Sequence, residues 1–396
     1  MILRQFQPMG VYETLFRFAA ATGTYMGEPG THPWAQGFPL TTPVPGGPEL
    51  PGSVAITATD RMYPKADGQP ALRAAIAAYY RRFYDARVAP ENVAVFAGGR
   101  PAILAVLTFL LEDVKVVVEE TEYTPYWDVL RALGREPALV PSRVENRFRP
   151  TLADHPAGER TFLVKSNPCN PTGVATRGAA LRGLVDHYRG PGRGALFDEA
   201  YEFFADPPES ALAHVGDIDG TNLFVVGAAT KGLQAPGIRI GWVVAGREHI
   251  ELFRNFSSFG MGGVSRASQL YATELLELER VARARTAIGA FYKMQRERYG
   301  RALERLGLEL FTGTGGFYHW GRLPRGLTGD AFNERLFEHN AGILPGRLCD
   351  MARRGDTGPL GPMMRFSFGP LPPESFEGDV AILERCLGVP QPAAGR

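Results

Sequence analysis

The chain has 396 residues, of which 44% are hydrophobic and 21% are charged. This length and composition are typical of a globular protein with one large domain and one smaller domain, and they do not indicate a disordered chain. The 43 basic and 42 acidic residues leave a formal net charge of +1, without a long run of one sign. The sequence therefore lacks the electrostatic signature of a protein that binds nucleic acid or an anionic membrane, and we expect small molecules or identical subunits as partners.

The N-terminal segment lacks the apolar core of a signal peptide, and the longest apolar run, residues 102–111, is too short to cross a bilayer. We therefore expect a cytoplasmic protein. The three cysteines, Cys169, Cys349 and Cys386, lie far apart and show neither a disulfide framework nor the spacing of metal ligands. We expect no structural metal.

Residues 1–50 are rich in Gly, Pro and aromatic residues and show little periodicity, so we predict an arm or loop segment there. From residue 70 onward, helical patterns alternate with short runs of β-branched and aromatic residues. The expected helices are 71–84 and 101–111, and the expected strands are 93–96, 114–118, 162–164, 195–197, 223–226 and 242–244. This alternation predicts an α/β fold with a mostly parallel sheet that is covered on both faces.

A long helical region over residues 265–306 then leads to a C-terminal part with its own Gly and Pro turns. This change of pattern indicates a second domain. We predict that residues 1–50 form the N-terminal arm and part of the small domain, that residues 51–285 form the large domain, and that residues 286–396 form a small C-terminal α/β domain.

Lys231, in Ala-Ala-Thr-Lys, is followed eight residues later by Arg239 in Gly-Ile-Arg-Ile-Gly. This is the layout of a lysine that forms an imine beside a phosphate-binding arginine, and it indicates pyridoxal phosphate (PLP) as the cofactor. The chain has five lysines, so the rivals can be compared one by one. Lys165 ends a predicted strand, but no arginine follows it at a useful spacing, and Lys115 and Lys293 are typical of solvated charges.

Two polar segments that follow predicted strands fit a pyridine cofactor. Asn170 lies in Asn-Pro-Cys-Asn-Pro-Thr-Gly, a run of turn formers, where it would donate a hydrogen bond to the phenolic oxygen of the ring. Asp198 would keep the ring nitrogen protonated and make the ring an electron sink, and Tyr201 would reach the same phenolic oxygen as Asn170. The alternatives are a turn without a ligand for Asn170 and a helix N-cap for Asp198.

The phosphate of such a cofactor needs donors, and Ala-Gly-Gly-Arg-Pro joins a predicted strand to a predicted helix. The N–H groups of Gly99 and Arg100 would cradle a phosphate there, together with Arg239 and the Thr230 hydroxyl. The alternative is a plain tight turn. Tyr123, just after another strand, would stack on a flat ring or is an ordinary aromatic residue at the edge of the sheet.

Arg365 lies in the apolar strand pattern Met-Met-Arg-Phe-Ser-Phe. A buried charge is costly unless it is paired, and a planar guanidinium suits a bidentate grip on a carboxylate. We therefore predict that Arg365 recognises the α-carboxylate of a substrate. An internal salt bridge is the alternative.

Taken together, these segments resemble the class I/II aminotransferase family, which consists of fold type I PLP-dependent enzymes, and the resemblance covers most of the chain. The segment Ala-Gln-Gly-Phe-Pro around Gly37 resembles the family's N-terminal substrate segment, and Tyr63 resembles the tyrosine that reaches the partner subunit's cofactor phosphate. Residues 315–318 and 344–346 resemble landmarks of the small domain. The resemblance implies a seven-stranded sheet, a small domain built from both termini, and a homodimer with active sites at its interface.

The resemblance further implies a PLP-dependent aminotransferase that acts on an α-amino acid through aldimine and quinonoid intermediates. Lys231 would form the imine and then act as the base, with Asp198 and Tyr201 as its catalytic companions and Asn170 as a contact of the substrate as well. One alternative is β- or γ-elimination or replacement on the same fold, including the use of S-adenosylmethionine. A second is a binding module without catalysis, which would not need the imine lysine and Asp198 together.

Two positions depart from the family pattern. Ala228 stands where the family usually has a hydroxyl residue that contacts phosphate, and Arg100 stands where a small or amide residue is more usual. Arg100 would either replace the missing phosphate contact or meet a second anionic group on the substrate.

Overall fold

The main sheet is built from short strands whose residues are almost all buried. The computed structural model describes residue 2 and residues 10–388. The strands are β1 (Val93–Phe96), β2 (Lys115–Glu119), β3 (Ala138–Val140), β4 (Thr161–Ser166), β5 (Arg193–Asp198), β6 (Leu223–Ala228) and β7 (Gly241–Val244). Within the described residues they form one seven-stranded sheet in the order β1-β7-β6-β5-β4-β2-β3, in which β7 runs antiparallel to both neighbours and the other pairs are parallel. The predicted α/β fold with a mostly parallel sheet is confirmed.

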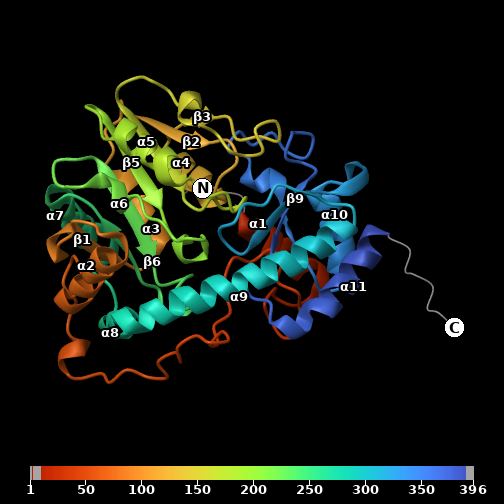
Figure 1. The fold of residues 1–396 in the computed structure, drawn as a ribbon, viewed down its shortest axis with the longest axis horizontal. Coiled ribbons are helices and arrows are strands. Elements are labelled where there is room, and N and C mark those ends of the chain that lie inside the picture. The colour runs from red at the N-terminus through yellow and green to blue at the C-terminus, as the bar shows by residue number, and fades with distance from the viewer. Residues whose placement is uncertain (1, 3–9, 389–396) are drawn as a thin grey trace.

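Helices cover both faces of this sheet (Figure 1). The helices are α1 (Val11–Thr22), α2 (Pro70–Tyr84), α3 (Gly99–Thr108), α4 (Thr124–Ala132), α5 (Gly178–Tyr188), α6 (Leu212–Val215), α7 (Arg247–Phe256), α8 (Arg266–Leu275), α9 (Leu278–Arg305), α10 (Gly329–Phe337) and α11 (Phe376–Leu387). Successive strand residues point to opposite faces, so Phe197 packs in one core with α2 and α5 while Leu196 packs in another with α3, α4 and α7. The two cores hold the strands rigidly and fix the loops at their ends.

A second, smaller sheet lies at the other end of the molecule. Its strands are β8 (Glu309–Leu310), β9 (Tyr318–Arg322), β10 (Leu344–Pro345) and β11 (Met363–Ser367), in the antiparallel order β10-β11-β9-β8. Helices α10 and α11 pack beside it, and Arg365 occupies the middle of β11. The small part of the protein therefore carries the arginine that the sequence pattern singled out.

Helix α1 corrects the expectation that the first fifty residues lack regular structure. Leu15 and Phe18 are buried in a core with Trp320 and Leu344 of the small sheet. The helix ends at Gly23, which adopts the left-handed conformation of a helix C-cap. The apolar residues of α1 recur at helical spacing, a signal that the surrounding Gly- and Pro-rich sequence obscured.

The long helix α9 connects the two sheets, as Figure 1 shows. The predicted helical region 265–306 consists of α8 and α9, separated where the side chain of Glu277 accepts hydrogen bonds from the first N–H groups of α9. Near its start, Arg280 donates to the carbonyl of Glu49 in the extended N-terminal segment, and farther along Tyr292 donates to the carbonyl of Gly369 at 2.8 Å. The predicted domain boundary at residue 285 lies within this helix.

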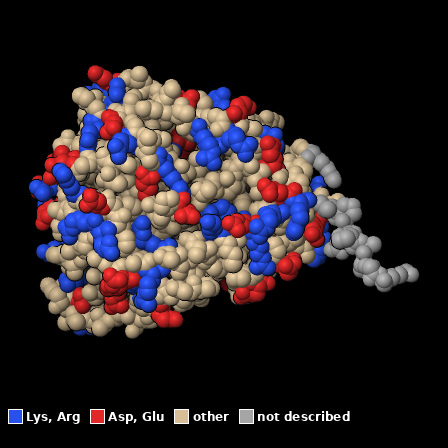
Figure 2. Space-filling model, in the orientation of Figure 1, with Lys and Arg blue, Asp and Glu red and all other residues tan. Residues whose placement is uncertain are grey.

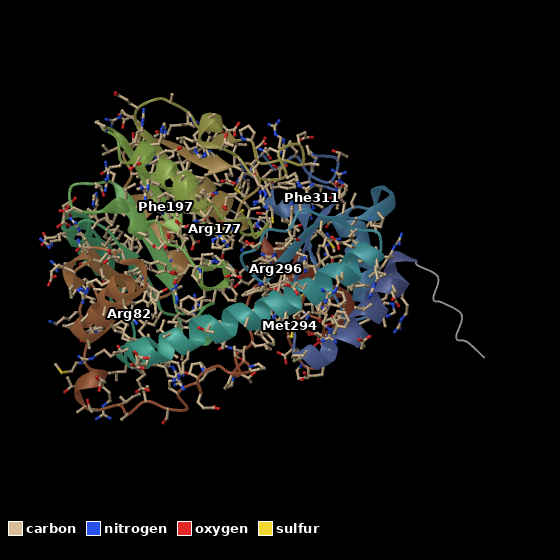
Figure 3. All side chains as sticks on the ribbon, in the orientation of Figure 1. Arg82, Arg177, Phe197, Met294, Arg296 and Phe311 are labelled. Atoms are coloured by element: carbon tan, nitrogen blue, oxygen red, sulfur yellow. The ribbon has the colours of Figure 1, made fainter. Side chains whose placement is uncertain are left out.

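Two arginines connect the large part of the protein and α9 to the loop 313–316, which precedes β9 of the small sheet. Arg296 donates to the carbonyl of Gly316 at 2.7 Å, and Arg177 donates to Thr314 Oγ1 at 3.2 Å. Figure 3 shows both arginines between the large sheet, marked by Phe197, and the small sheet side, marked by Phe311. The loop from 313 to 316 is thereby held against both the large part and α9.

Charges of both signs are interspersed on the face shown in Figure 2, and neither sign forms a continuous patch there. Among the helices that the structure describes, none is both long enough and apolar enough to cross a membrane.

Candidate active site

The loops that follow β1, β4, β5 and β6 meet at one edge of the large sheet and enclose a cavity of about 400 Å³. In α/β proteins this carboxyl edge is where ligands bind. The predicted residues that line the cavity are Gly37, Gly99, Arg100, Tyr123, Asn170, Asp198, Tyr201, Thr230, Lys231, Arg239 and Arg365. The structure thus brings together all the predicted site residues except Tyr63, whose side chain is 92% exposed and outside the cavity.

Lys231 lies just after β6 with its amine inside the cavity. Its Nζ donates to the carbonyl of Gly37, and it lies 5.6 Å from the centre of the Tyr201 ring. Burial, together with the positive charges of Arg100 and Arg365, lowers the pKa of Lys231 to about 7. The amine is therefore available in its unprotonated, nucleophilic form near neutral pH.

Asp198 ends β5 and points into the same cavity. Its carboxylate accepts hydrogen bonds from Tyr126 Oη at 3.1 Å and from the Ala200 N–H at 3.1 Å, and within the described residues no cation forms an ion pair with it. Burial raises the pKa of Asp198 above its usual range. Tyr126 was not singled out from the sequence, although it lies three residues after Tyr123.

The start of α3 and Arg239 form a donor-rich corner. Gly98 precedes α3 with a φ of 109°, and a Cβ at that position would collide with Nη2 of Arg239. Arg239 is itself held in a left-handed conformation with a φ of 57°, and its Nη1 donates to the carbonyl of Pro236 at 2.8 Å. The free N–H groups of the first turn of α3 and the guanidinium therefore share one corner that suits an anion.

Arg365 reaches the cavity from the small sheet. Its Nη1 donates to Asn170 Oδ1 at 2.8 Å and its Nη2 donates to the carbonyl of Ala35 at 2.6 Å, while its Nε is buried without a partner. The guanidinium carbon lies 4.2 Å from the centre of the Tyr318 ring, and the Tyr318 hydroxyl contacts that of Tyr201. The described residues offer Arg365 no carboxylate, in contrast to the alternative of an internal salt bridge.

Arg100 stands beside Tyr123 at the cavity wall. Its Nε donates to the Tyr123 hydroxyl at 2.8 Å, and its guanidinium carbon lies 5.8 Å from the ring centre. Arg100, Arg239, Arg365 and Lys231 face a cavity in which Asp198 is the single carboxylate among the described lining residues. Such a cavity attracts ligands with more than one negative group.

The rival lysine has a different role. Lys165 is buried in β4 and paired with Glu119 at the end of β2, and this pairing raises its pKa although burial opposes the charge. Lys165 does not line the cavity, whereas its neighbour Ser166 does.

Several lining residues were missed because their signal is weak in the sequence. Helix α1 contributes Val11, Tyr12 and Leu15, and α3 contributes Ile103. Together they contribute apolar lining to the cavity. The helical spacing within α1 was the available signal, but nothing in the sequence indicates that α1 packs over the cavity.

A second hollow of about 230 Å³ lies at the opposite edge of the sheet, where β4, β5 and β6 begin. Its lining is largely aromatic and aliphatic, with Phe109, Phe224 and Phe253 among its residues. It contains none of the predicted site residues, so the chemistry is assigned to the cavity at the carboxyl edge.

Comparisons with known proteins agree with this fold and cavity. The family model of class I and II aminotransferases matches residues 46–358. An aspartate aminotransferase from Pyrococcus horikoshii is 24% identical over 286 residues, which cover 70% of this chain and 73% of that protein. An LL-diaminopimelate aminotransferase from Dehalococcoides mccartyi is 26% identical over 330 residues, 76% of this chain and 80% of that protein.

Among solved structures, the aspartate aminotransferase from Thermus thermophilus with maleate matches with a TM-score of 0.81 at 21% identity, over 97% of this chain and 100% of that chain. The fold is therefore that of the fold type I enzymes. Because the family model covers most of its length, the chain belongs to the class I and II aminotransferase family and is an enzyme that transfers amino groups.

Proposed function

We propose that the protein is an aminotransferase for an α-amino acid, with PLP held in the cavity at the carboxyl edge and attached to Lys231. The observation that carries this proposal is a buried lysine whose pKa is lowered to about 7, in a cavity with three guanidinium groups and one buried carboxylate. An amine that is neutral near pH 7 forms an imine readily.

The residues present fit the cofactor. The corner made by Gly99, Thr230 and Arg239 suits its phosphate, and Tyr123 lies where a ring would stack. Asp198 is a buried carboxylate with which no cation of the described residues forms an ion pair, and a protonated ring nitrogen would supply one. When bound, PLP supplies an electron sink for negative charge at the substrate α-carbon.

The chain's own residues would then bind the substrate and move its proton. Lys231 would take the proton from the α-carbon of the substrate, because a large fraction of its amine is unprotonated near neutral pH. Arg365 would bind the α-carboxylate, since its position is already fixed by Asn170 and Ala35 while its Nε has no partner. The Tyr201 hydroxyl would hold the phenolic oxygen of the cofactor from the side of Tyr318.

We further propose a cytoplasmic homodimer in which Tyr63 reaches the neighbouring subunit's cofactor phosphate. Tyr63 is exposed, and the exposed fractions of Met62 and Ile56 in the same segment are 66% and 55%. These exposed apolar side chains support the proposal that a neighbouring subunit covers the segment. The three cysteines, all buried and unpaired, suit a reducing compartment.

The proposal is tested by reducing the purified protein with borohydride and mapping the peptides. We expect the reduced cofactor on Lys231 and a visible or near-ultraviolet absorption band that amino acids convert to the pyridoxamine form, with release of a keto acid. Lys231→Ala should still bind PLP but should neither be labelled nor turn over.

Labelling of Lys165, or of no lysine, would refute the assignment of Lys231. Incubation with S-adenosylmethionine distinguishes the elimination alternative, because release of methylthioadenosine without the pyridoxamine form would contradict amino transfer. The variant Lys293→Ala is a matched control, since Lys293 is exposed and lies on α9 outside the cavity.

A further inference from the structure

A buried chain of hydrogen bonds runs from Glu122 to the residue that holds Arg365. Glu122, just after β2, is fully buried, and Ser166 at the end of β4 contacts it through its hydroxyl, at 2.7 Å from Oε2, and through its N–H, at 3.3 Å. Ser166 Oγ in turn accepts the N–H of Asn170 at 3.0 Å. Asn170 Oδ1 then accepts from Arg365 Nη1 at 2.8 Å.

This chain fixes the amide of Asn170 in one orientation. Arginine only donates, so the Asn170 oxygen faces Arg365 and the amide nitrogen is left as a donor. The backbone of Asn170 is held at the same time, because Ser166 Oγ is the acceptor that the structure gives its N–H. Without that oxygen, a buried N–H would be left unsatisfied, and the turn that carries Asn170 would lose its anchor.

Ser166 can serve Asn170 whatever the protonation form of Glu122. Burial, together with the negative charge of Glu119, raises the pKa of Glu122 to about 8. A hydroxyl donates one hydrogen and accepts two, so Ser166 bonds to the carboxyl group in either form and keeps a lone pair for the Asn170 N–H. Lys165 does not compete for this carboxyl, because it is paired with Glu119.

We propose that Glu122 and Ser166 are positioning residues which, through Asn170, set the orientation of Arg365 toward the substrate carboxylate and of the Asn170 amide toward the cofactor. The inference rests on the proposed function, since it assumes that Arg365 and Asn170 meet substrate and cofactor. Ser166 lines the cavity, but its hydroxyl is engaged by Glu122 and by the Asn170 N–H, and Glu122 is not among the lining residues. Both act by holding Asn170.

The test is Ser166→Ala, which removes one oxygen and keeps the size of the residue. A matched control is Ser375→Ala, because Ser375 Oγ donates to the buried carboxylate of Asp379 at 2.8 Å in the small part of the protein. Each variant loses a serine hydroxyl that donates to a buried carboxylate. Only Ser166 is connected to Asn170.

We expect Ser166→Ala to raise the KM for the amino acid by about tenfold, because a misoriented Arg365 would lose about one well-placed charged hydrogen bond to the substrate carboxylate. The change in kcat should be much smaller. The absorption band of the bound cofactor should also shift, because the Asn170 amide is released. Ser375→Ala should lower the thermal midpoint without changing either readout. Glu122→Gln, which keeps an acceptor oxygen for the Ser166 hydroxyl, should leave KM within about twofold of the wild-type value and the absorption band at its wild-type position.

The inference is overturned if Ser166→Ala behaves as Ser375→Ala does, with an unchanged KM and an unchanged cofactor band. It is also overturned if Ser166→Ala lowers kcat and leaves KM unaltered, since Arg365 would then not depend on Ser166. A wild-type protein that shows no cofactor on Lys231 would instead refute the proposed function.

Discussion

Lys231 destabilises the cofactor-free protein because its charge is poorly accommodated. Its pKa falls from 10.5 to about 7 on folding. Between these pH values the unfolded chain binds more protons than the folded one, so the free energy of unfolding rises with pH across this window. The destabilisation is fully present below about pH 7 and disappears above the unfolded pKa.

We therefore expect Lys231→Met to stabilise the cofactor-free protein at pH 6 by an amount on the order of a few kcal/mol. The gain should shrink as the pH approaches 9. Thermal unfolding of both cofactor-free proteins at pH 6 and pH 9 measures the difference. An equal gain at the two pH values would show that the lysine does not titrate between them.

Arg365 should tolerate no change of geometry. The planar guanidinium of Arg365 contacts Asn170 and Ala35 and would contact a carboxylate at the same time. A lysine keeps the charge, but its ammonium group lacks the planar geometry that makes these contacts possible. We expect Arg365→Lys to raise the KM for a free amino acid by at least about tenfold. The corresponding amino acid amide, which lacks the carboxylate, should be affected much less. Equal losses with both compounds would mean that Arg365 is structural.

At the scale of elements, the strands were predictable because each is a short apolar run. The predicted strand 93–96 coincides with β1, and the other predicted strands lie within one residue of, or inside, β2, β4, β5, β6 and β7. The elements without a prediction include α1, β3 and α4. Their positions depend on packing, as in α4, where Tyr126 and Leu130 are buried in the core beside α3 and α7.

The candidate site likewise contains residues that the sequence pattern predicts and residues whose position depends on tertiary packing. Asp198 ends a strand, Asn170 and Lys231 lie a few residues beyond strand ends, and parallel topology brings those strand ends together. Which residues lie in the wall formed by α1, by contrast, depends on how the small part packs over the cavity. The hydrogen-bond chain through Ser166 depends in the same way on tertiary contacts that no local pattern encodes.

The joint between β1 and α3 gives a prediction at this scale. Gly98 has a φ of 109° and lies against Arg239, so a side chain there strains the backbone and displaces the guanidinium. We expect Gly98→Ala to weaken PLP binding by about tenfold or more, measured as the dissociation constant of the cofactor by fluorescence. Gly237→Ala is the control, because nothing lies within 4 Å of a Cβ at that position. Equal affinities in the two variants would contradict a phosphate role for this corner.

At the scale of the whole molecule, the proposed assembly predicts a particle of about twice the chain's 43.2 kDa in light scattering. Mixing subunits tests the place of Tyr63. Lys231→Ala and Tyr63→Ala each have two defective sites, but a mixed dimer would combine an intact Lys231 with an intact Tyr63 of the neighbouring subunit in one site. We expect activity to reappear on mixing. If Tyr63 acted within its own subunit, mixing would restore nothing.

Helix α9 has 28 residues, and a helix of that length spans about 42 Å at 1.5 Å per residue. Near its start it contacts Glu49, in the segment that leads toward Tyr63. Beyond its midpoint it contacts the small part, where Arg298 donates to the carbonyl of Pro373 at 2.8 Å and Tyr299 donates to Asp379 at 2.6 Å. In mechanical terms it is a lever, because a tilt of about 5° around its midpoint moves each end by about 2 Å in opposite directions. A shift of the small part as Arg365 engages a carboxylate would therefore be transmitted toward the segment that carries Tyr63. In the proposed homodimer, α9 would then couple the two active sites mechanically.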